Sequence, residues 1–275
     1  MPYQVSDSKS YDLCLLDTNI ISEMLNNHQD ELKSFLEKFG PTKYAPCFTI
    51  YNIIELHRRE DLYKKFLNFF SIYPCFLLKP YNVLFEEELE SYSEDYSISP
   101  LLKSYSPLKK YNIDQFESFL KYVFSKNNIK QSVVNWRNEE REILTNWLGN
   151  RENFSPSKQV PNSIDAQSYI KQAGIQTIIN HNPKGAWKLI NNGVIIDIDR
   201  FPAIKVMLYS QYYRLFDPNW KPRPQEVTDV LIMGSTPYVD CVVTEKFQAE
   251  ILKKVKYKVT GLEQVDIKTL KNLRK

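Results

Sequence analysis

The sequence has few of the residues from which nucleotide-binding loops and hydrolase triads are built. It contains only 7 glycines in 275 residues, and none of them forms a G-x-G-x-x-G or a G-x-x-x-x-G-K-[ST] loop. The 3 histidines lack the i, i+4 spacing of a metal-binding helix, and no serine lies in a G-x-S-x-G elbow. ATPase and dinucleotide-binding functions are therefore excluded, and a hydrolase triad is disfavoured.

Cysteine is also scarce, and long apolar runs are missing. The 4 cysteines are far apart in apolar contexts, which predicts reduced core residues without zinc spacing. No run approaches the roughly 18 to 20 apolar residues that cross a bilayer. The opening residues, MPYQVSDSKSYD, lack the apolar core of a signal peptide. We therefore expect a cytoplasmic protein without a membrane partner.

A large excess of charge of one sign is absent as well. The formal net charge of +3 is too small to indicate a nucleic-acid partner by itself. Lysines concentrate in ILKKVKYKV and IKTLKNLRK, where they suit phosphate contacts or, alternatively, a solvated helix face. With 43% hydrophobic and 25% charged residues, the composition is that of an ordinary globular protein.

Strand and helix patterns alternate at both ends of the chain. The apolar run at 13–16 predicts a buried strand before a helix at about 19–26. Residues 50–57 keep the i, i+3, i+4, i+7 spacing of a helix, with Thr49 as its N-cap. CFLLKP predicts a second strand and residues 241–244 a third. This alternation predicts an α/β fold in which helices cover a central parallel sheet.

The middle of the chain has a different character. Residues 81–200 are first acidic, then charged and helical, and they include a Ser/Pro/Asn loop at NFSPSKQVPNS. No strand alternation is sustained there. We therefore expect one domain over residues 1–275 with a large, mainly helical insertion at 81–200. The apolar stripes of its helices predict that it packs beside the site and shapes access to it.

Several carboxylates lie at strand ends or on helix faces with apolar neighbours. Asp17 ends the first strand pattern, Glu55 borders the apolar stripe of its helix, and Asp229 precedes an apolar helical run. Asp240 and Glu245 flank the strand CVVT. The carboxyl ends of parallel strands form a ligand-binding crevice, and carboxylates gathered there need a cation such as Mg²⁺ or Mn²⁺ to offset their repulsion. The set suggests a metal-dependent nuclease.

Each of these residues, taken alone, also suits a structural role. Asp17 and the two residues after it suit a helix N-cap, and Glu55 suits a solvated helix face. Asp229 suits an ion pair with a basic residue of WKPRP, and Asp240 suits a cap or a turn into the strand. Their joint occurrence in one chain favours the acidic site.

Two other motifs fit competing functions. Asp197 and Asp199, in NNGVIIDIDRF, are similar to the D-x-D pair of phosphatases that use an aspartyl nucleophile. Such a pair normally opens its fold, so a surface pair of Asp199 with Arg200 is favoured instead. The tyrosines of YSQYYRLF have a spacing that suits base stacking, but core packing is the favoured interpretation.

Three segments together resemble the motifs of PIN-domain nucleases. LLDTNIISEM matches the opening apolar-Asp-Thr-Asn motif, and IYNIIEL matches the segment with the family glutamate. VTDVLIMGSTPYVDCVVTEKF matches the closing motif of Asp, small helix, and strand ending in Thr and an acidic residue. The three segments fall within roughly the first 80 and the last 75 residues. The stretch between them has no counterpart in the small toxin-like members.

The resemblance implies a PIN-like three-layer fold with a Mg²⁺- or Mn²⁺-dependent endonuclease site. It assigns Asp17, Glu55 and Asp229 to the core metal ligands. The fourth acidic place falls to Asp240, which is favoured, or to Glu245. It also implies that Asn19 orients Asp17, that Thr244 lies at the rim of the cleft, and that Thr18 is a further orienting or substrate-contacting residue.

The substrate and partners follow from the resemblance alone. RNA is favoured over DNA, and the alternatives are a structure-dependent DNA nuclease and a catalytically silent PIN-like module that binds nucleic acid or protein. An antitoxin or another protein regulator is a candidate partner. Small PIN proteins often dimerise, so an oligomer is a further expectation, although the insertion at 81–200 can replace or block that surface.

Overall fold

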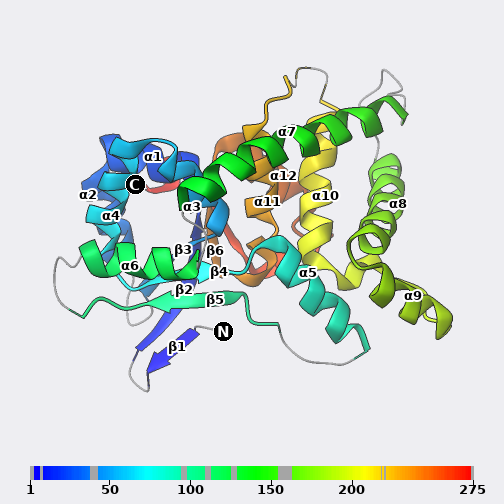
Figure 1. Cartoon of the computed structure of the whole chain (residues 1–275), viewed down its shortest axis with the longest axis horizontal. Coiled ribbons are helices and arrows are strands. Elements are labelled where there is room, and N and C mark those ends of the chain that lie inside the picture. The colour runs from blue at the N-terminus through cyan, green and yellow to red at the C-terminus, as the bar shows by residue number, and fades with distance from the viewer. Residues whose placement is uncertain are drawn as a thin grey trace.

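The chain folds around a mixed β-sheet with helices on both faces (Figure 1). The computed structural model describes residues 3–6, 9–37, 43–93, 98–108, 113–124, 129–153, 163–217, 219 and 221–273, and the structural statements below concern these residues. The strands are β1 (Tyr3–Ser6), β2 (Lys9–Leu16), β3 (Lys43–Phe48), β4 (Cys75–Leu78), β5 (Leu101–Tyr105), β6 (Cys241–Val243) and β7 (Asp266–Lys268).

The sheet has the order β5-β4-β3-β2-β6-β7, and β1 pairs with β2 beside this path. The pairs β2–β3, β3–β4, β2–β6 and β6–β7 are parallel, whereas β5 and β1 pair antiparallel with β4 and β2. The expected α/β class is confirmed, but the sheet is mixed instead of parallel throughout. The register places Leu16 opposite Val243, so β2 and β6 end side by side.

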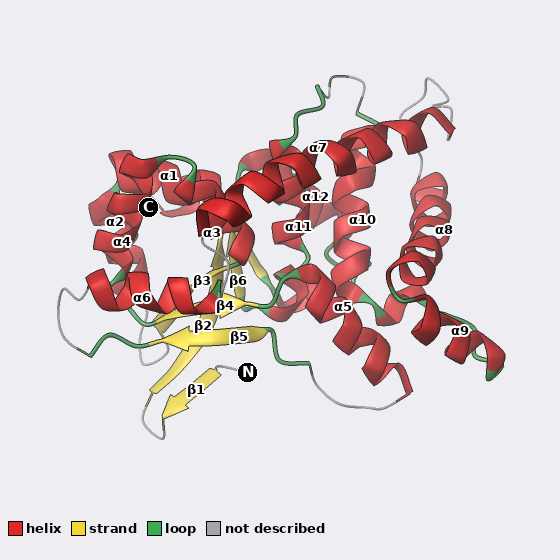
Figure 2. Cartoon of the chain, in the orientation of Figure 1, coloured by secondary structure: helices red, strands yellow, loops and turns green. Residues whose placement is uncertain are grey.

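The helices join and flank these strands (Figure 2). They are α1 (Thr18–Asn27), α2 (Gln29–Glu37), α3 (Ile50–His57), α4 (Glu60–Phe70), α5 (Tyr81–Glu90), α6 (Ile113–Val123), α7 (Ile129–Asn153), α8 (Ser163–His181), α9 (Pro183–Asn191), α10 (Pro202–Leu215), α11 (Gln225–Met233), α12 (Lys246–Val255) and α13 (Leu270–Leu273). Short 3-10 turns lie at η1 (Ser91–Ser93), η2 (Ile198–Arg200), η3 (Thr236–Tyr238) and η4 (Leu262–Gln264).

Both faces of the sheet are buried, and each carries its own core. Leu13 and Leu15 of β2 pack into one core with α5 and α7 to α12, while Cys14 and Leu16 pack into the other with α1, α2, α4 and α6. Successive side chains of a strand point to opposite faces, so a run that is apolar at every position serves both cores. This explains why the strand at 13–16 has no polar alternation.

Residues 81–200 are integrated with the rest of the fold. Their described part forms α5 to α9, together with η1, η2 and the strand β5. The strand was not expected, because only Tyr105 of β5 is buried and its apolar signal is therefore weak. Helix α7 packs on α3 and α11, and α8 packs on α10.

The start of α3 is fixed by a capping box. The Asn52 backbone N–H donates to the Thr49 hydroxyl at 3.4 Å, and the Thr49 backbone N–H donates to Asn52 Oδ1 at 2.7 Å. This reciprocal pair satisfies donors that would otherwise be unpaired at the helix start. Thr49 is thus the N-cap that the sequence predicts, and α3 presents Glu55 near its last turn.

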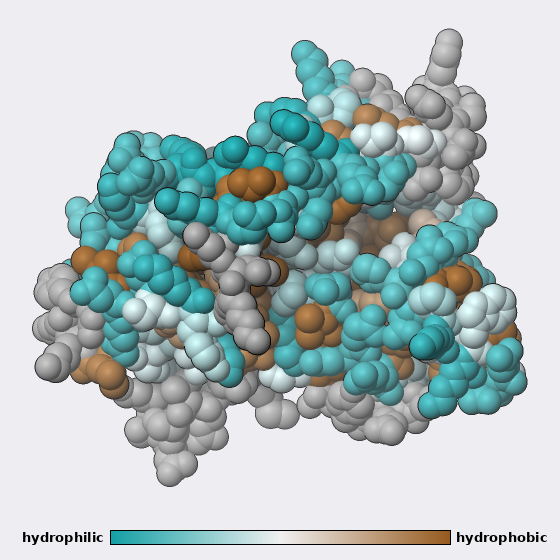
Figure 3. All heavy atoms as spheres, in the orientation of Figure 1, coloured by the Kyte–Doolittle hydropathy of each residue, from teal (hydrophilic) through white to brown (hydrophobic). Residues whose placement is uncertain are grey.

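The surface seen in Figure 3 is mostly hydrophilic, with apolar side chains in separate patches. Among the described helices, none is both long and apolar enough to cross a membrane. The cysteines are buried and free, as expected: Cys14, Cys47, Cys75 and Cys241.

Candidate acidic site

Asp17 lies at the junction of β2 and α1, where it is the N-cap of the helix. Its backbone N–H donates to the Val243 carbonyl at 3.0 Å, which ties the end of β2 to the end of β6. Its Oδ2 accepts a hydrogen bond from the Thr244 hydroxyl at 2.6 Å, and its Oδ1 accepts one from the Asn19 backbone N–H at 3.4 Å. Because the side chain is buried, these contacts set its orientation.

Three further carboxylates share the electrostatic environment of Asp17. Glu55 lies on α3, Asp229 lies on α11, and Glu245 is the N-cap residue of α12. The Asp17 charge raises the pKa of all three, and Glu55 and Glu245 also raise the pKa of Asp229. We call these four residues the acidic cluster. It lies at the carboxyl ends of β2 and β6, where the strand order reverses and open α/β sheets bind ligands.

Burial is the main cause of the raised pKa values in the acidic cluster. The pKa of Glu55 is raised to about 8, mainly by loss of hydration and also by the Asp17 charge, while a hydrogen bond from Thr18 lowers it. Within the described residues, Glu55 Oε2 is buried and has no hydrogen-bond partner. Burial also raises the pKa of Asp17, although the hydrogen bond from Thr244 lowers it. Glu55 is therefore mostly protonated at neutral pH.

A buried arginine faces the acidic cluster. Arg214 of α10 is only 1% exposed, and it donates to Gln248 Oε1 at 2.7 Å and to the Ser210 carbonyl at 3.3 Å. Burial lowers the pKa of Arg214, while Asp229 is the strongest of the charges that raise it. The Arg214 charge lowers the pKa of Asp229, but burial and the neighbouring carboxylates raise it by more, so this pKa is well above its ordinary value. Arg214 thus offsets the cluster's negative charge only in part.

Asp240 lies at the other end of β6. Its Oδ2 accepts a hydrogen bond from the Leu13 backbone N–H at 2.7 Å, and its own N–H donates to the Leu13 carbonyl at 3.0 Å. Since β2 and β6 run parallel, the residues before and after β6 lie at opposite edges of the sheet. The expectation that Asp240 shares the cleft with Asp17 is therefore wrong, and Glu245 is the carboxylate that lies beside Asp17.

The small polar residues near Asp17 are structural supports of the cluster. Thr244 is fully buried instead of lying at the rim. Thr18 hydrogen-bonds Glu55 and accepts from Asn52 Nδ2 at 2.9 Å. Asn19 contacts Asp17 through its backbone, and its side chain is exposed. Asn52 and Arg214 were not predicted from the sequence. Asn52 could have been predicted, because it occupies the capping-box position three residues after Thr49.

A cavity of about 940 Å³ lies between α1, α12 and α13, and Glu245 is the member of the acidic cluster that lines it. Asn19 and Glu245 line it on the side of the cluster, and its other charged side chains are of both signs, namely Glu23, Glu250, Lys246, Lys253 and Lys271. Its size is within the usual range of small-molecule pockets, roughly 300 to 1,000 Å³. The cavity gives Glu245 access to ligands from solvent.

Helix α7 holds the two helices that carry Glu55 and Asp229. Glu140 of α7 is 2% exposed, and it pairs with Arg58 at the end of α3 through contacts of 2.6 and 3.2 Å. It also accepts a hydrogen bond from the Thr228 hydroxyl of α11, which in turn accepts from Trp136 Nε1 at 2.9 Å. Through α7, the segment at 81–200 therefore holds in place the helices that carry Glu55 and Asp229.

The donor set suits a hard divalent cation, but the side chains do not form a ready metal cage. Carboxylate oxygens are the ligands that Mg²⁺ and Mn²⁺ prefer, and Glu55 Oε2 is a buried oxygen that has no hydrogen-bond partner among the described residues. No group of three Asp, Glu, His or Cys side chains within the described ranges is arranged to hold an ion. Asp17 instead accepts hydrogen bonds from Thr244 and from the Asn19 backbone, and Glu55 accepts one from Thr18.

The competing motifs have structural roles. Asp197 caps η2 by accepting from the Asp199 backbone N–H at 3.0 Å, and Asp199 pairs with Lys205 instead of Arg200. The tyrosines of α10 are mainly core residues, with Tyr209 and Tyr212 buried.

In comparisons with known proteins, no protein-family model, no curated protein and no solved structure matches the chain.

Without divalent cations, the free energy of unfolding should fall as the pH rises from about 6 to 8. The pKa of Glu55 is about 8 in the folded protein against an ordinary 4.5, so between these values the folded state holds a proton that the unfolded chain has lost, and the stability falls until Glu55 ionises near pH 8. Glu55→Gln should remove that part of the slope in thermal melts.

Glu88 of α5 provides a matched control, because burial raises its pKa to about 8 as well. Glu88→Gln should also flatten the slope. Added Mn²⁺ should flatten it in wild type and in Glu88→Gln, since a bound cation favours the ionised carboxylates of the acidic cluster. A wild-type melting temperature that does not change from pH 6 to 8 would contradict this account of Glu55.

Proposed function

We propose that the chain is a PIN-like, metal-dependent endonuclease that hydrolyses phosphodiester bonds, with RNA favoured over DNA. The observation that carries the proposal is the acidic cluster at the sheet's switch point. Burial raises the pKa values of all four carboxyl groups, and neighbouring carboxylate charges raise those of Glu55, Asp229 and Glu245 as well. Strongly perturbed carboxyl groups beside a cavity are typical of functional sites. The preference for RNA rests on the motif resemblance alone.

A Mg²⁺ or Mn²⁺ ion would be held by Asp17, Glu55, Asp229 and Glu245. When bound, it supplies charge stabilisation to the phosphodiester and its leaving oxygen. Thr244 orients Asp17 through the 2.6 Å hydrogen bond, and Glu55 gives up its proton when positive charge arrives. Arg214 offsets part of the negative charge that remains.

The second candidate function is a catalytically silent PIN-like module that binds nucleic acid or protein. Arg214 favours it, because a built-in cation reduces the cluster's need for a metal ion. A structure-dependent DNA nuclease remains the alternative enzyme. An antitoxin-like regulator and a cytoplasmic location stay parts of the proposal that derive from the motifs and the composition.

Asp229→Asn separates the two functions. As a metal ligand, Asp229 lies near like charges, so the substitution should keep or raise the metal-free melting temperature. The same change should weaken Mn²⁺ binding and lower RNA cleavage by about 10²-fold. The measurements are melting with and without Mn²⁺, calorimetric Mn²⁺ titration, and cleavage of labelled single-stranded RNA and DNA with Mg²⁺, Mn²⁺ or EDTA.

If Asp229 serves mainly as the partner of Arg214, the outcome is reversed. The variant would melt lower, because a buried cation loses its counter-charge, and cleavage would be unchanged. A wild-type protein that neither binds Mn²⁺ nor cuts either nucleic acid would favour the silent module.

A further inference from the structure

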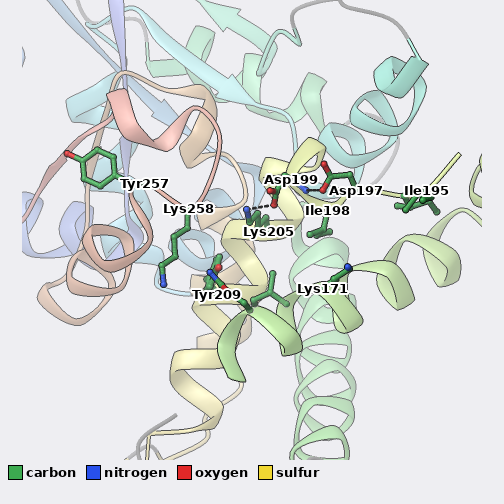
Figure 4. Close-up of a pocket in the computed structure, with 12 residues that line it drawn as sticks. Lys171, Ile195, Asp197, Ile198, Asp199, Lys205, Tyr209, Tyr257 and Lys258 are labelled. Atoms are coloured by element: carbon green, nitrogen blue, oxygen red, sulfur yellow. Dashed lines mark hydrogen bonds and ion pairs between the residues drawn. The ribbon is translucent and has the colours of Figure 1, made fainter. Parts of the chain in front are cut away.

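A second cavity, of about 750 Å³, lies between α8, η2, α10 and the turn that follows α12 (Figure 4). None of the four carboxylates of the acidic cluster lines it. Helix α10 connects the two places, with Lys205 in this cavity and Arg214 facing the acidic cluster. Nine residues of helix separate them, which corresponds to about 14 Å along the helix axis.

Three lysines reach this cavity from three different elements. Lys171 comes from α8, Lys205 from α10 and Lys258 from the turn after α12, and all three are labelled in Figure 4. Lys205 is buried and pairs with Asp199, while Lys171 is exposed. Lys258 Nζ lies 6.0 Å from the centre of the Tyr209 ring. Lysines that line one cavity from separate elements suit an anion such as a phosphate group.

Part of the cavity wall is apolar. Ile170, Ile196 and Ile198 are buried residues that line it. Burial raises the pKa of Tyr209 to about 12, so its hydroxyl keeps the proton at neutral pH and remains a hydrogen-bond donor. A phosphate group alone would leave this apolar surface uncovered, whereas a ligand with a flat organic part would cover it.

We propose that this cavity binds a nucleoside phosphate. The phosphate lies among Lys171, Lys258 and the Tyr209 hydroxyl, and the base and sugar cover the isoleucine wall. Asp197 lines the cavity with an exposed side chain and accepts from a sugar hydroxyl or a base amino group. Two sources supply this chemistry: a free nucleotide, or one nucleotide of a strand that also reaches the acidic cluster. The second source rests on the proposed nuclease function.

The test is calorimetric titration in EDTA, so that cleavage plays no part. The probes are adenosine 5′-monophosphate, a single-stranded RNA hexamer and inorganic phosphate. Lys171→Glu and Lys258→Glu should each weaken binding by about tenfold, because each removes a charge-assisted contact. The matched control is Lys33→Glu on α2, an exposed residue outside this cavity, and it should bind like wild type.

Binding of the monophosphate supports a free nucleotide as the ligand, and binding of the hexamer alone supports a nucleic-acid strand. If a strand is the ligand, added salt should weaken hexamer binding less steeply in the two lysine variants than in wild type. The proposal is overturned if neither organic probe binds, or if the cavity variants bind like Lys33→Glu. Equal affinity for inorganic phosphate and the monophosphate also overturns it, because the apolar wall would then contribute nothing. The titration requires no cleavage, so a lack of nucleotide binding would not contradict the nuclease proposal. Likewise, a protein that cleaves no nucleic acid would not contradict binding of a free nucleotide.

Discussion

Asp17→Asn is expected to lower RNA cleavage by about 10³-fold while the protein stays folded. A metal ligand's charge accounts for several kcal/mol of transition-state stabilisation, which corresponds to a loss of this order. Asparagine has the same shape and keeps one oxygen that can accept from Thr244, the contact now measured at 2.6 Å. Because burial raises the pKa of Asp17, removing its charge also relieves a cost in the folded state. Initial cleavage rates and thermal melts measure the two effects.

Asp240→Asn is the matched control for Asp17→Asn. It makes the same chemical change at the other end of β6, where Asp240 accepts from the Leu13 N–H at 2.7 Å. Cleavage should be unaffected, whereas Glu245→Gln should lower it. If Asp17→Asn cleaves RNA as fast as wild type, Asp17 serves only as a helix cap. An equal loss of cleavage in Asp240→Asn would contradict the placement of the site at the edge of the sheet where β2 and β6 end.

Glu140→Gln is expected to destabilise the folded protein by about 3 to 5 kcal/mol. Glu140 and Arg58 form a buried ion pair, with side chains 3% and 14% exposed, and removing one partner leaves an uncompensated charge. The loss is a large share of a typical folding stability of roughly 5 to 15 kcal/mol. Because the pair joins α7 to α3, we also expect weaker Mn²⁺ binding at the acidic cluster. Urea unfolding and Mn²⁺ titration are the measurements.

Two further variants separate ion pairing from general damage. Glu60→Gln removes an ion pair between Glu60 and Lys64, whose side chains are 81% and 65% exposed, and it should change stability little because solvent screens the pair. Arg58→Met combined with Glu140→Met should recover part of the loss, because no buried charge is left unpaired. A Glu140→Gln protein as stable as Glu60→Gln would mean that α7 does not brace the site.

The largest disagreements between sequence and structure concern position along a strand. Asp240 and Glu245 flank one strand pattern, and both looked suitable as the fourth carboxylate. Which of them lies beside Asp17 depends on the direction of β6 relative to β2, and a parallel pair places the residue after the strand at the site. A local pattern contains no information on strand direction. The strand β5 was missed for a related reason, since its pairing with β4 is a tertiary contact.

The sequence by itself determined the α/β class, the strand at 13–16, the capped helix after Thr49 and the buried free cysteines. These features depend on local periodicity and on short-range hydrogen bonds, which are readable along the chain. Only the tertiary structure decided that Arg214 faces the acidic cluster and that Glu140 pairs with Arg58 across 82 positions. Such contacts arise when segments distant in sequence pack together, and burial then sets the pKa values that make the carboxylates a candidate site.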